Sequence, residues 1–445
     1  MLIVGCGDHS TASSDPDAAL LPDANDAGHA DAATDAAVDP CASSACVKAV
    51  TVGAGHACAL YTDGSARCVG SNASGQLGDG TMTNRAAPVA VTGLTGVTSL
   101  NAGPSATCAT RSDGTAACWG DNSNGVLGDG TNQQRSTPSN LAMTTGVVWA
   151  QTGLVTGSAL LADGTARTWG INNDHRLGIG TSTPTFVPTQ VVGVTGLVSL
   201  SQDIFGGCGL LQSGDVTCWG SNTNGQLGAP GPSRDAATIT NFSGATSIVT
   251  SDYTRCAVLT DGTARCWGDG HSGQLGDGNP PVSSSPPVAV TGLDEISEVV
   301  LGDNGQTACA RRSDKTVWCW GAGGGGELGD GTFTSSRSTP VQALVTDVVQ
   351  LVPMYTAWFA VRADGSVWSW GRNERNQLGD GTFDNRATPA PIAGLVDIRS
   401  LVTNRDSSTP IACALSSQNK VSCWGAANLA HSAPLTNLRP TLVAF

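Results

Sequence analysis

The sequence is poor in charged residues, which make up 13% of its 445 positions, and it contains no cluster of lysines or arginines. Because a nucleic-acid-binding protein needs such a basic patch to neutralise phosphates, we expect no nucleic-acid partner. No apolar run reaches about 18 residues, so no membrane-spanning helix is encoded. No Ser/His/Asp set, His-Glu-x-x-His motif or phosphate-binding loop is recognisable, which removes the commonest signs of hydrolase, metal and nucleotide chemistry.

Glycine, by contrast, is abundant at 58 residues, and it is arranged in a repeat. In one copy, residues 58–81, an apolar strand leads to an Asp-Gly turn and a second strand returns to a closing glycine. A loop follows that ends in Gly-Gln-Leu-Gly-Asp-Gly-Thr. The pattern occurs eight times at steps of 48 to 54 residues, which is typical of a β-propeller. The closing glycines are Gly70, Gly120, Gly170, Gly220, Gly268, Gly321, Gly371 and Gly425.

Each unit contains four short strands, which is the content of one propeller blade. In the second unit these strands are residues 88–91, 97–100, 107–110 and 116–119. The repeats begin at a second strand, residues 47–50, and end at a first strand, residues 440–443. We therefore predict an all-β propeller of eight four-stranded blades over residues 47–445. The two terminal pieces are expected to complete one blade together, which closes the ring and removes a free sheet edge.

The cysteines follow the repeat. The three-residue loop at 62–64 places Cys58 directly opposite Cys68, at a non-hydrogen-bonded pair of strand residues that is close enough for a disulfide. Two units lack both cysteines of the pair, whereas random loss would leave single cysteines. The predicted disulfides are Cys58–Cys68, Cys108–Cys118, Cys208–Cys218, Cys256–Cys266, Cys309–Cys319 and Cys413–Cys423. They indicate an oxidising, extracytoplasmic compartment; the alternative is reduced cysteines in the core.

Residues 1–6 resemble the end of a bacterial lipoprotein signal peptide. In that family the cysteine after a short apolar triplet is lipidated, and here Cys6 follows Ile3-Val4-Gly5. The basic region and most of the apolar region of such a signal are absent, which is expected if the assigned start lies too late. A stray cysteine near a disordered start is the alternative.

The segment 7–46 reads as a disordered tether. Residues 7–40 hold eight aspartates and no lysine or arginine, with little that could be buried. Cys41 and Cys46 stand directly before the first repeat strand, where we expect a small disulfide loop. A metal site is the alternative, although two cysteines without histidine make a poor one.

The linked motifs Cys-Ala-Leu, Asp-Gly, Cys-Trp-Gly and Gly-Gln-Leu-Gly-Asp-Gly-Thr resemble the regulator of chromosome condensation repeat family over residues 47–445. The family implies a β-propeller, usually of seven blades, so seven blades is the alternative to the eight counted. Its eukaryotic namesake exchanges guanine nucleotide on a small nuclear GTPase and docks on chromatin. A bacterial relative inhibits β-lactamases with one face of the disc. The resemblance thus implies a fold and protein binding rather than one chemistry.

The loop aspartates, a recurring arginine, and His56 with the strand-end tryptophans are further candidate functional residues. The loop aspartates fit turn formation better than calcium binding, because one carboxylate per loop is too few for that ion. A recurring arginine either pairs with a loop aspartate and pins neighbouring blades, or is solvated. His56 and the tryptophans at strand ends are interpreted as structural, and no cofactor or metal site is predicted. The loop positions are Asp79, Asp129, Asp277, Asp330 and Asp380, with Arg85, Arg135, Arg337 and Arg386.

We expect a non-catalytic extracytoplasmic propeller that binds an unidentified protein, or alternatively a glycan, with one face of the disc. It is secreted or held at the cell envelope, with membrane contact only through a lipid on Cys6. A second hypothesis is a propeller hydrolase or lyase that uses non-recurring polar residues near the central channel. A third is a guanine-nucleotide exchange factor like the family namesake, which requires a reduced, cytosolic protein.

Overall fold

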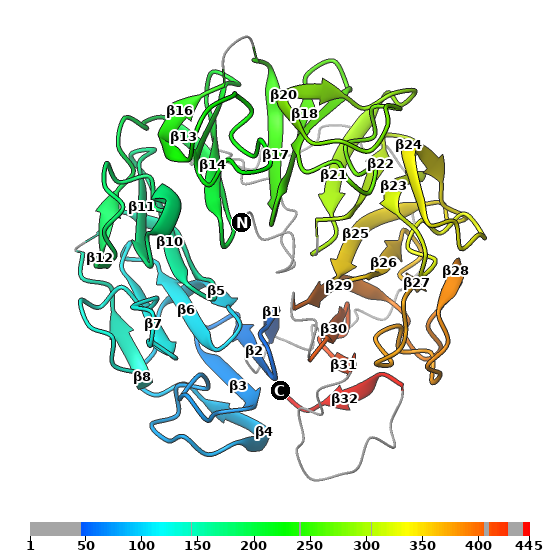
Figure 1. Cartoon of the computed structure of the whole chain (residues 1–445). Helices are drawn as coiled ribbons and strands as arrows, with labels where there is room; N and C mark the ends of the chain where they lie inside the picture. The colour runs from blue at the N-terminus through cyan, green and yellow to red at the C-terminus, as the bar shows by residue number, and fades with distance from the viewer. Residues whose placement is uncertain (1–45, 144, 240–241, 304, 405–408, 426–438) are drawn as a thin grey trace, which may run out of the picture.

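The computed structural model describes residues 46–445 apart from 144, 240–241, 304, 405–408 and 426–438. The predictions of a signal remnant at residues 1–6, of lipidation at Cys6, of a tether from residue 7 and of a disulfide from Cys41 concern residues outside this described part. Eight four-stranded antiparallel sheets stand as blades around a central axis, which confirms the all-β propeller and its eight blades (Figure 1). In the described part of the chain the one helical element is a single 3-10 turn, η1 (Asn173–His175). No helix there is long and apolar enough to cross a bilayer.

Within each blade the strands follow the chain outward from the axis, so blade 1 is β1 to β4 and blade 8 is β29 to β32. The innermost strands are β1 (Val47–Val52), β5 (Val97–Ala102), β9 (Val147–Thr152), β13 (Leu197–Gln202), β17 (Ala245–Ser251), β21 (Ile296–Leu301), β25 (Val348–Met354) and β29 (Ile398–Thr403). The second strands are β2 (His56–Tyr61), β6 (Ala106–Arg111), β10 (Thr156–Leu161), β14 (Gly206–Leu211), β18 (Thr254–Leu259), β22 (Thr307–Arg312), β26 (Ala357–Arg362) and β30 (Ile411–Ser416).

The third strands are β3 (Ala66–Gly70), β7 (Ala116–Gly120), β11 (Ala166–Gly170), β15 (Val216–Gly220), β19 (Ala264–Gly268), β23 (Val317–Ala322), β27 (Val367–Gly371) and β31 (Val421–Gly425). The outermost strands are β4 (Arg85–Ala90), β8 (Arg135–Asn140), β12 (Thr185–Gln190), β16 (Arg234–Thr238), β20 (Ser284–Ala289), β24 (Ser336–Gln342), β28 (Arg386–Pro391) and β32 (Thr441–Val443).

The second and third strands of each blade are joined by the three-residue loop that the sequence predicts. In blade 1 the amide of Tyr61 donates to the carbonyl of Ser65, and Gly64 has φ +77°. This register sets Cys58 against Cys68, with Cα atoms 4.1 Å apart. The sulfur atoms of all six predicted strand pairs lie 2.04 to 2.12 Å apart, which is disulfide distance.

Tryptophan side chains fill the space between blades. Trp119, at the end of β7, is fully buried, and its Nε1 donates to the carbonyl of Gln76 in blade 1 at 2.9 Å. The same hydrogen bond to the preceding blade recurs for Trp169, Trp267, Trp320, Trp370 and Trp424. The recurring tryptophans are therefore packing residues, as predicted.

The predicted shared terminal blade is wrong. Strand β32 pairs with β31 of its own blade, and β1 pairs with β2. The reason is that the strand that opens each sequence repeat pairs with the end of the preceding repeat, as β4 does with β3. The blade boundary therefore falls inside the sequence repeat, and no strand is missing from either terminal blade.

The ring is closed instead by packing between blades 1 and 8. Arg399 Nη2 donates to the carbonyl of Val47 at 2.7 Å, and Asn404 Nδ2 donates to the carbonyl of Gly53 at 3.1 Å. A single apolar cluster spans the junction, and Phe445 at the chain end packs against it. The cluster contains Val47, Val50, Val52, Val402, Ile411 and Cys413.

The disc has two different faces. The long-loop face carries the turns between innermost and second strands together with the loops between third and outermost strands, and the two sets meet where Ser71 donates its amide to Gly55. The hairpin face carries the three-residue loops and the connections between blades, which meet where Val97 donates to Gly64.

Candidate functional site

The long loops are held by a network that uses the recurring aspartate and arginine. In blade 1 the Asp79 carboxylate lies 2.7 Å from the Arg85 guanidinium and accepts from the Thr81 hydroxyl at 2.7 Å. Burial alone would raise the pKa of Asp79, but hydrogen bonds from Thr81 and Arg85 outweigh it and lower the pKa. Both partners belong to one blade, so the proposed pinning of neighbouring blades is wrong, and the pair fixes the loop itself.

The turns between innermost and second strands are where the blades differ most. We call these turns, which surround the axis on the long-loop face, the axial rim. Their described residues are 53–55, 103–105, 153–155, 203–205, 252–253, 302–303, 305–306, 355–356, 404 and 409–410. In blades 1 and 2 the rim residues are small, Gly-Ala-Gly and Gly-Pro-Ser, whereas blades 3, 4, 5 and 7 present large apolar or aromatic side chains.

Blades 3 to 5 place these large side chains on consecutive turns. Leu154 is 58% exposed, and the rings of Phe205 and Tyr253 contact each other with centroids 4.3 Å apart at 31°. Tyr355 of blade 7 is 37% exposed on the same rim. The strands recur in every blade, but these large apolar and aromatic side chains do not. The rim of blades 3 to 5 therefore differs from the rim of blades 1 and 2 in the side chains that it carries.

A buried ion pair lies beneath the aromatic contact. Asp203 Oδ2 is 2.8 Å from Arg255 Nη2, and the two side chains are only 4% and 2% exposed. Asp203 Oδ1 accepts from the amides of Phe205 (2.8 Å) and Gly206 (3.1 Å). Arg255 Nη1 donates to the carbonyl of Asp252 at 3.0 Å. The pair thus fixes both turns and holds Phe205 against Tyr253.

The long loop of blade 3, beside the turn of blade 4, is also exceptional. Asp174 and His175 have φ +57° and +58°, values that cost a non-glycine residue conformational energy. His175 takes the place of Gly75 in the repeat, and its Nδ1 lies 3.3 Å from Asp235. The carbonyl of Arg176 accepts from Gln202 Nε2 at 3.2 Å.

This loop changes the contact between blades 3 and 4. The Arg176 carbonyl corresponds to the carbonyl that elsewhere accepts from the blade tryptophan, and Trp219 Nε1 is buried without a partner among the described residues. Burial lowers the pKa of Arg176, while Asp174 and Asp203 act in the opposite direction. Charged groups that do not recur therefore gather around the rim of blades 3 to 5.

The residues predicted from the sequence lie away from this rim. The paired cysteines face each other in the middle of their blades, and their side chains are buried. His56 is buried with its Nε2 3.0 Å from the Thr107 hydroxyl, and burial lowers its pKa to about 4. No group of three or more metal-binding side chains occurs in the described part of the chain.

Asp203, Phe205, Tyr253 and Arg255 were not predicted as site residues. The sequence signal that could have found them is that each differs from the residue at the corresponding position of the other repeats. Asp203 and Phe205 stand where blade 1 has Gly53 and Gly55, but only the fold shows that they meet the turn of blade 5.

Comparison with known families identifies the repeat. Two models of the regulator of chromosome condensation (RCC1) repeat match, one at residues 364–413 and the other at residues 47–76, 97–126 and 245–274. The chain therefore contains regulator of chromosome condensation repeats. A comparison with curated protein sequences gives no match.

Solved structures share the fold of this RCC1-repeat propeller. Prp20p from Saccharomyces cerevisiae, described with its binding to Gsp1p and histones, has a TM-score of 0.63 at 18% identity, covering 79% of this chain and 92% of that one. Yeast Prp20 bound to Kap60 gives 0.62 at 18% identity, with 79% and 89% covered. Human WBSCR16 gives 0.59 at 19% identity, with 74% and 94% covered. At these identities the likeness establishes the fold.

Proposed function

We propose that this RCC1-repeat propeller is a non-catalytic, extracytoplasmic protein-binding module that engages its partner with the axial rim of blades 3 to 5. The observation that carries the proposal is the contact of Phe205 with Tyr253 beside the exposed Leu154, on turns that are small in blades 1 and 2. Aromatic side chains held in place by packing are the usual anchors of protein interfaces. The binding of protein partners by the structural relative Prp20p supports this choice.

The proposed compartment rests on the cysteine pairs. Six pairs at disulfide distance favour an oxidising environment, because thiols stay reduced in the cytosol. This weighs against the exchange of nucleotide on a cytosolic GTPase. Attachment to the cell envelope through a lipid on Cys6 is part of the proposal, and mass measurement of the N-terminal peptide from the native host tests it.

The charged groups at the rim favour binding over catalysis. Asp203 and Arg255 are buried, and both are engaged with each other and with backbone groups of the two turns. A catalytic carboxylate needs access to a substrate, whereas these residues position the turns. The ion pair is therefore interpreted as the support of a binding surface.

Affinity capture with the oxidised full chain tests the proposed surface. The wild-type protein should retain one saturable partner from envelope and secreted proteins, and the double variant Phe205→Ala/Tyr253→Ala should lose it. The matched control is Val396→Ala, which removes a side chain that is 68% exposed on the hairpin face. Equal retention by the rim variant and the wild type, with unchanged melting temperatures, would rule out this rim as the binding surface.

A further inference from the structure

The junction between blades 4 and 5 departs from the others at the tip of the long loop. At four other junctions a loop glycine amide donates to a carbonyl on the outermost strand of the next blade, and the acceptor in blade 2 is Ser136. The bonds are Gly80 to Ser136 (2.9 Å), Gly130 to Phe186 (3.0 Å), Gly278 to Ser338 (2.8 Å) and Gly331 to Ala387 (3.0 Å). At the junction of blades 3 and 4 the Gly180 amide instead donates to the Asp235 carboxylate.

In blade 4 the glycine of this bond is replaced by Pro230, which has no N–H to donate. The corresponding acceptor, the carbonyl of Ser285, therefore lacks the donor that its counterparts receive. The Ser285 hydroxyl is also buried without a hydrogen-bond partner among the described residues. Ala229 takes the place of the loop aspartate of blade 4, and Ser284 takes the place of the loop arginine of blade 5, so the Asp–Arg pair seen in blade 1 is missing from each of these two blades.

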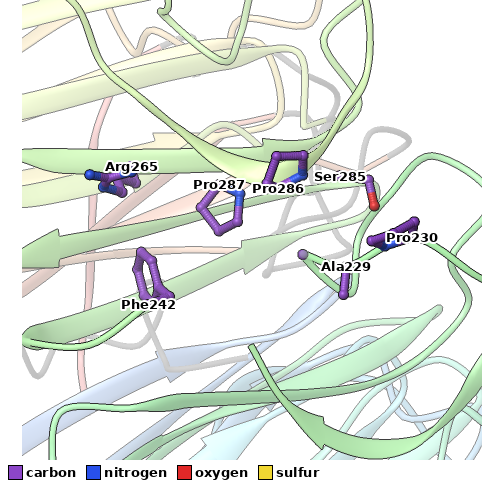
Figure 2. A pocket seen from close by; sticks show the side chains of 8 residues that line it. Ala229, Pro230, Phe242, Arg265, Ser285, Pro286 and Pro287 are labelled. Atoms are coloured by element: carbon purple, nitrogen blue, oxygen red, sulfur yellow. The ribbon is translucent and has the colours of Figure 1, made fainter. Parts of the chain in front are cut away.

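A groove of about 430 Å³ opens at this place, on the side wall of the disc. Figure 2 shows Arg265 at one end, Ser285 and Pro230 at the other, and the rings of Pro286 and Pro287 between them. The lining residues are Gly228, Ala229, Pro230, Phe242, Arg265, Ser285, Pro286 and Pro287. The volume lies within the range of roughly 300–1,000 Å³ of pockets that bind small molecules or short segments.

The walls of the groove are apolar and firmly packed. Phe242 is 7% exposed, and its ring lies edge-on to the buried Trp267 with centroids 5.6 Å apart. Arg265 is exposed and takes part in none of the ion pairs found in the described chain. The nearby carboxylate of Asp261 has its pKa lowered mainly by hydrogen bonds from Thr263, whose hydroxyl donates to it at 2.6 Å, and only weakly by Arg265.

We propose that this groove binds an extended peptide segment that carries an apolar residue and a nearby carboxylate. The repeat itself indicates the first interaction, since a backbone N–H serves the equivalent carbonyl at four other junctions. A peptide amide would donate to the Ser285 carbonyl in the same way, and an apolar side chain would lie against Phe242 and the prolines. The carboxylate would accept from Arg265, a charge-assisted hydrogen bond. This site is separate from the axial rim.

The probe is the peptide acetyl-Ala-Leu-Ala-Glu amide, with its Gln counterpart for comparison, titrated into the full chain and followed by saturation-transfer NMR. The Glu peptide should bind roughly tenfold more tightly than the Gln peptide, because the latter loses the charged hydrogen bond. Arg265→Gln should remove this difference. Arg167→Gln is the matched control, because Arg167 occupies the same strand position in blade 3, away from the groove.

Restoring the repeat sequence provides the decisive variant. Ala229→Asp/Pro230→Gly returns the missing amide to the Ser285 carbonyl, so we expect a melting temperature no lower than wild type and at least a roughly tenfold loss of peptide affinity. Unchanged affinity in this variant, or no binding of the Glu peptide to the wild type, would overturn the proposal. Self-association of the wild type that this variant abolishes would also overturn it, because a second copy would then be the occupant.

Discussion

The carboxylate of Asp203 and the guanidinium of Arg255 form an ion pair of 2.8 Å that joins blades 4 and 5 beneath the axial rim. Burying the pair costs desolvation energy. Each partner also makes a hydrogen bond to the backbone of its own turn: Asp203 accepts from the amide of Phe205, and Arg255 donates to the carbonyl of Asp252. The contribution of the pair to the free energy of unfolding can therefore be measured separately from its effect on partner binding at the rim.

Replacing one member of this pair should destabilise the protein strongly. Arg255→Met leaves the Asp203 carboxylate buried without its partner, and we expect a loss of about 3 kcal/mol in the free energy of unfolding, measured by urea denaturation. Asp203→Asn combined with Arg255→Met should cost less than the two single changes together. A double-mutant cycle that gives additive effects would contradict the assigned coupling.

The register of the hairpins predicts that a seventh hairpin disulfide is possible. Ser158 lies opposite Thr168 in blade 3, as Cys58 lies opposite Cys68 in blade 1. Ser158→Cys/Thr168→Cys should form a bond and stabilise the oxidised protein by about 2 kcal/mol, slightly offset by the lost hydrogen bond from Thr168 to Leu177. Peptide mapping without reductant checks the link, and the same variant under reduction is the control. Alkylation of a cysteine that belongs to one of the six hairpin pairs, in the unreduced wild type, would contradict those pairs.

His56 should make stability depend on pH. Burial lowers its pKa to about 4, below the ordinary value of 6.5, so between these values the unfolded chain takes up a proton that the folded chain does not. Its contribution is complete above pH 6.5 and is lost as pH falls to about 4, by about 3 kcal/mol in total. Unfolding free energies across this window should decline less steeply in His56→Gln. An identical decline in both proteins would contradict this role.

The loop aspartates should make the protein less stable at acidic pH. Burial acts to raise the pKa of Asp129, but hydrogen bonds from Thr131 and Arg135 together outweigh it and lower the pKa. Their stabilisation is present above about pH 4 and is lost as pH falls further. Asp129→Asn should cost about 1 kcal/mol at neutral pH, because the arginine partner is partly exposed. It should cost less near pH 3. Thermal unfolding at the two pH values measures this, with the exposed Asp384→Asn as the control.

Much of the fold could be predicted because repetition exposes it. The loop of residues 62–64 fixes the pairing of Cys58 with Cys68, since hairpin register follows from loop length. The blade count follows from the number of repeats. The assignment of strands to blades was predicted wrongly, because the sequence repeat and the blade begin at different strands, as β4 and β32 show.

The sequence by itself determined the propeller, its eight blades, the hairpin register and the positions of the paired cysteines, because each depends on contacts between residues close along the chain. Only the tertiary structure decided how the ring closes, that Asp203 and Phe205 meet Arg255 and Tyr253, and that Pro230 opens a groove at Ser285. The rim and groove relationships join residues about 50 positions apart in adjacent blades, and ring closure joins residues 351 and 352 positions apart. Local chain geometry does not encode which departures from the repeat will face each other.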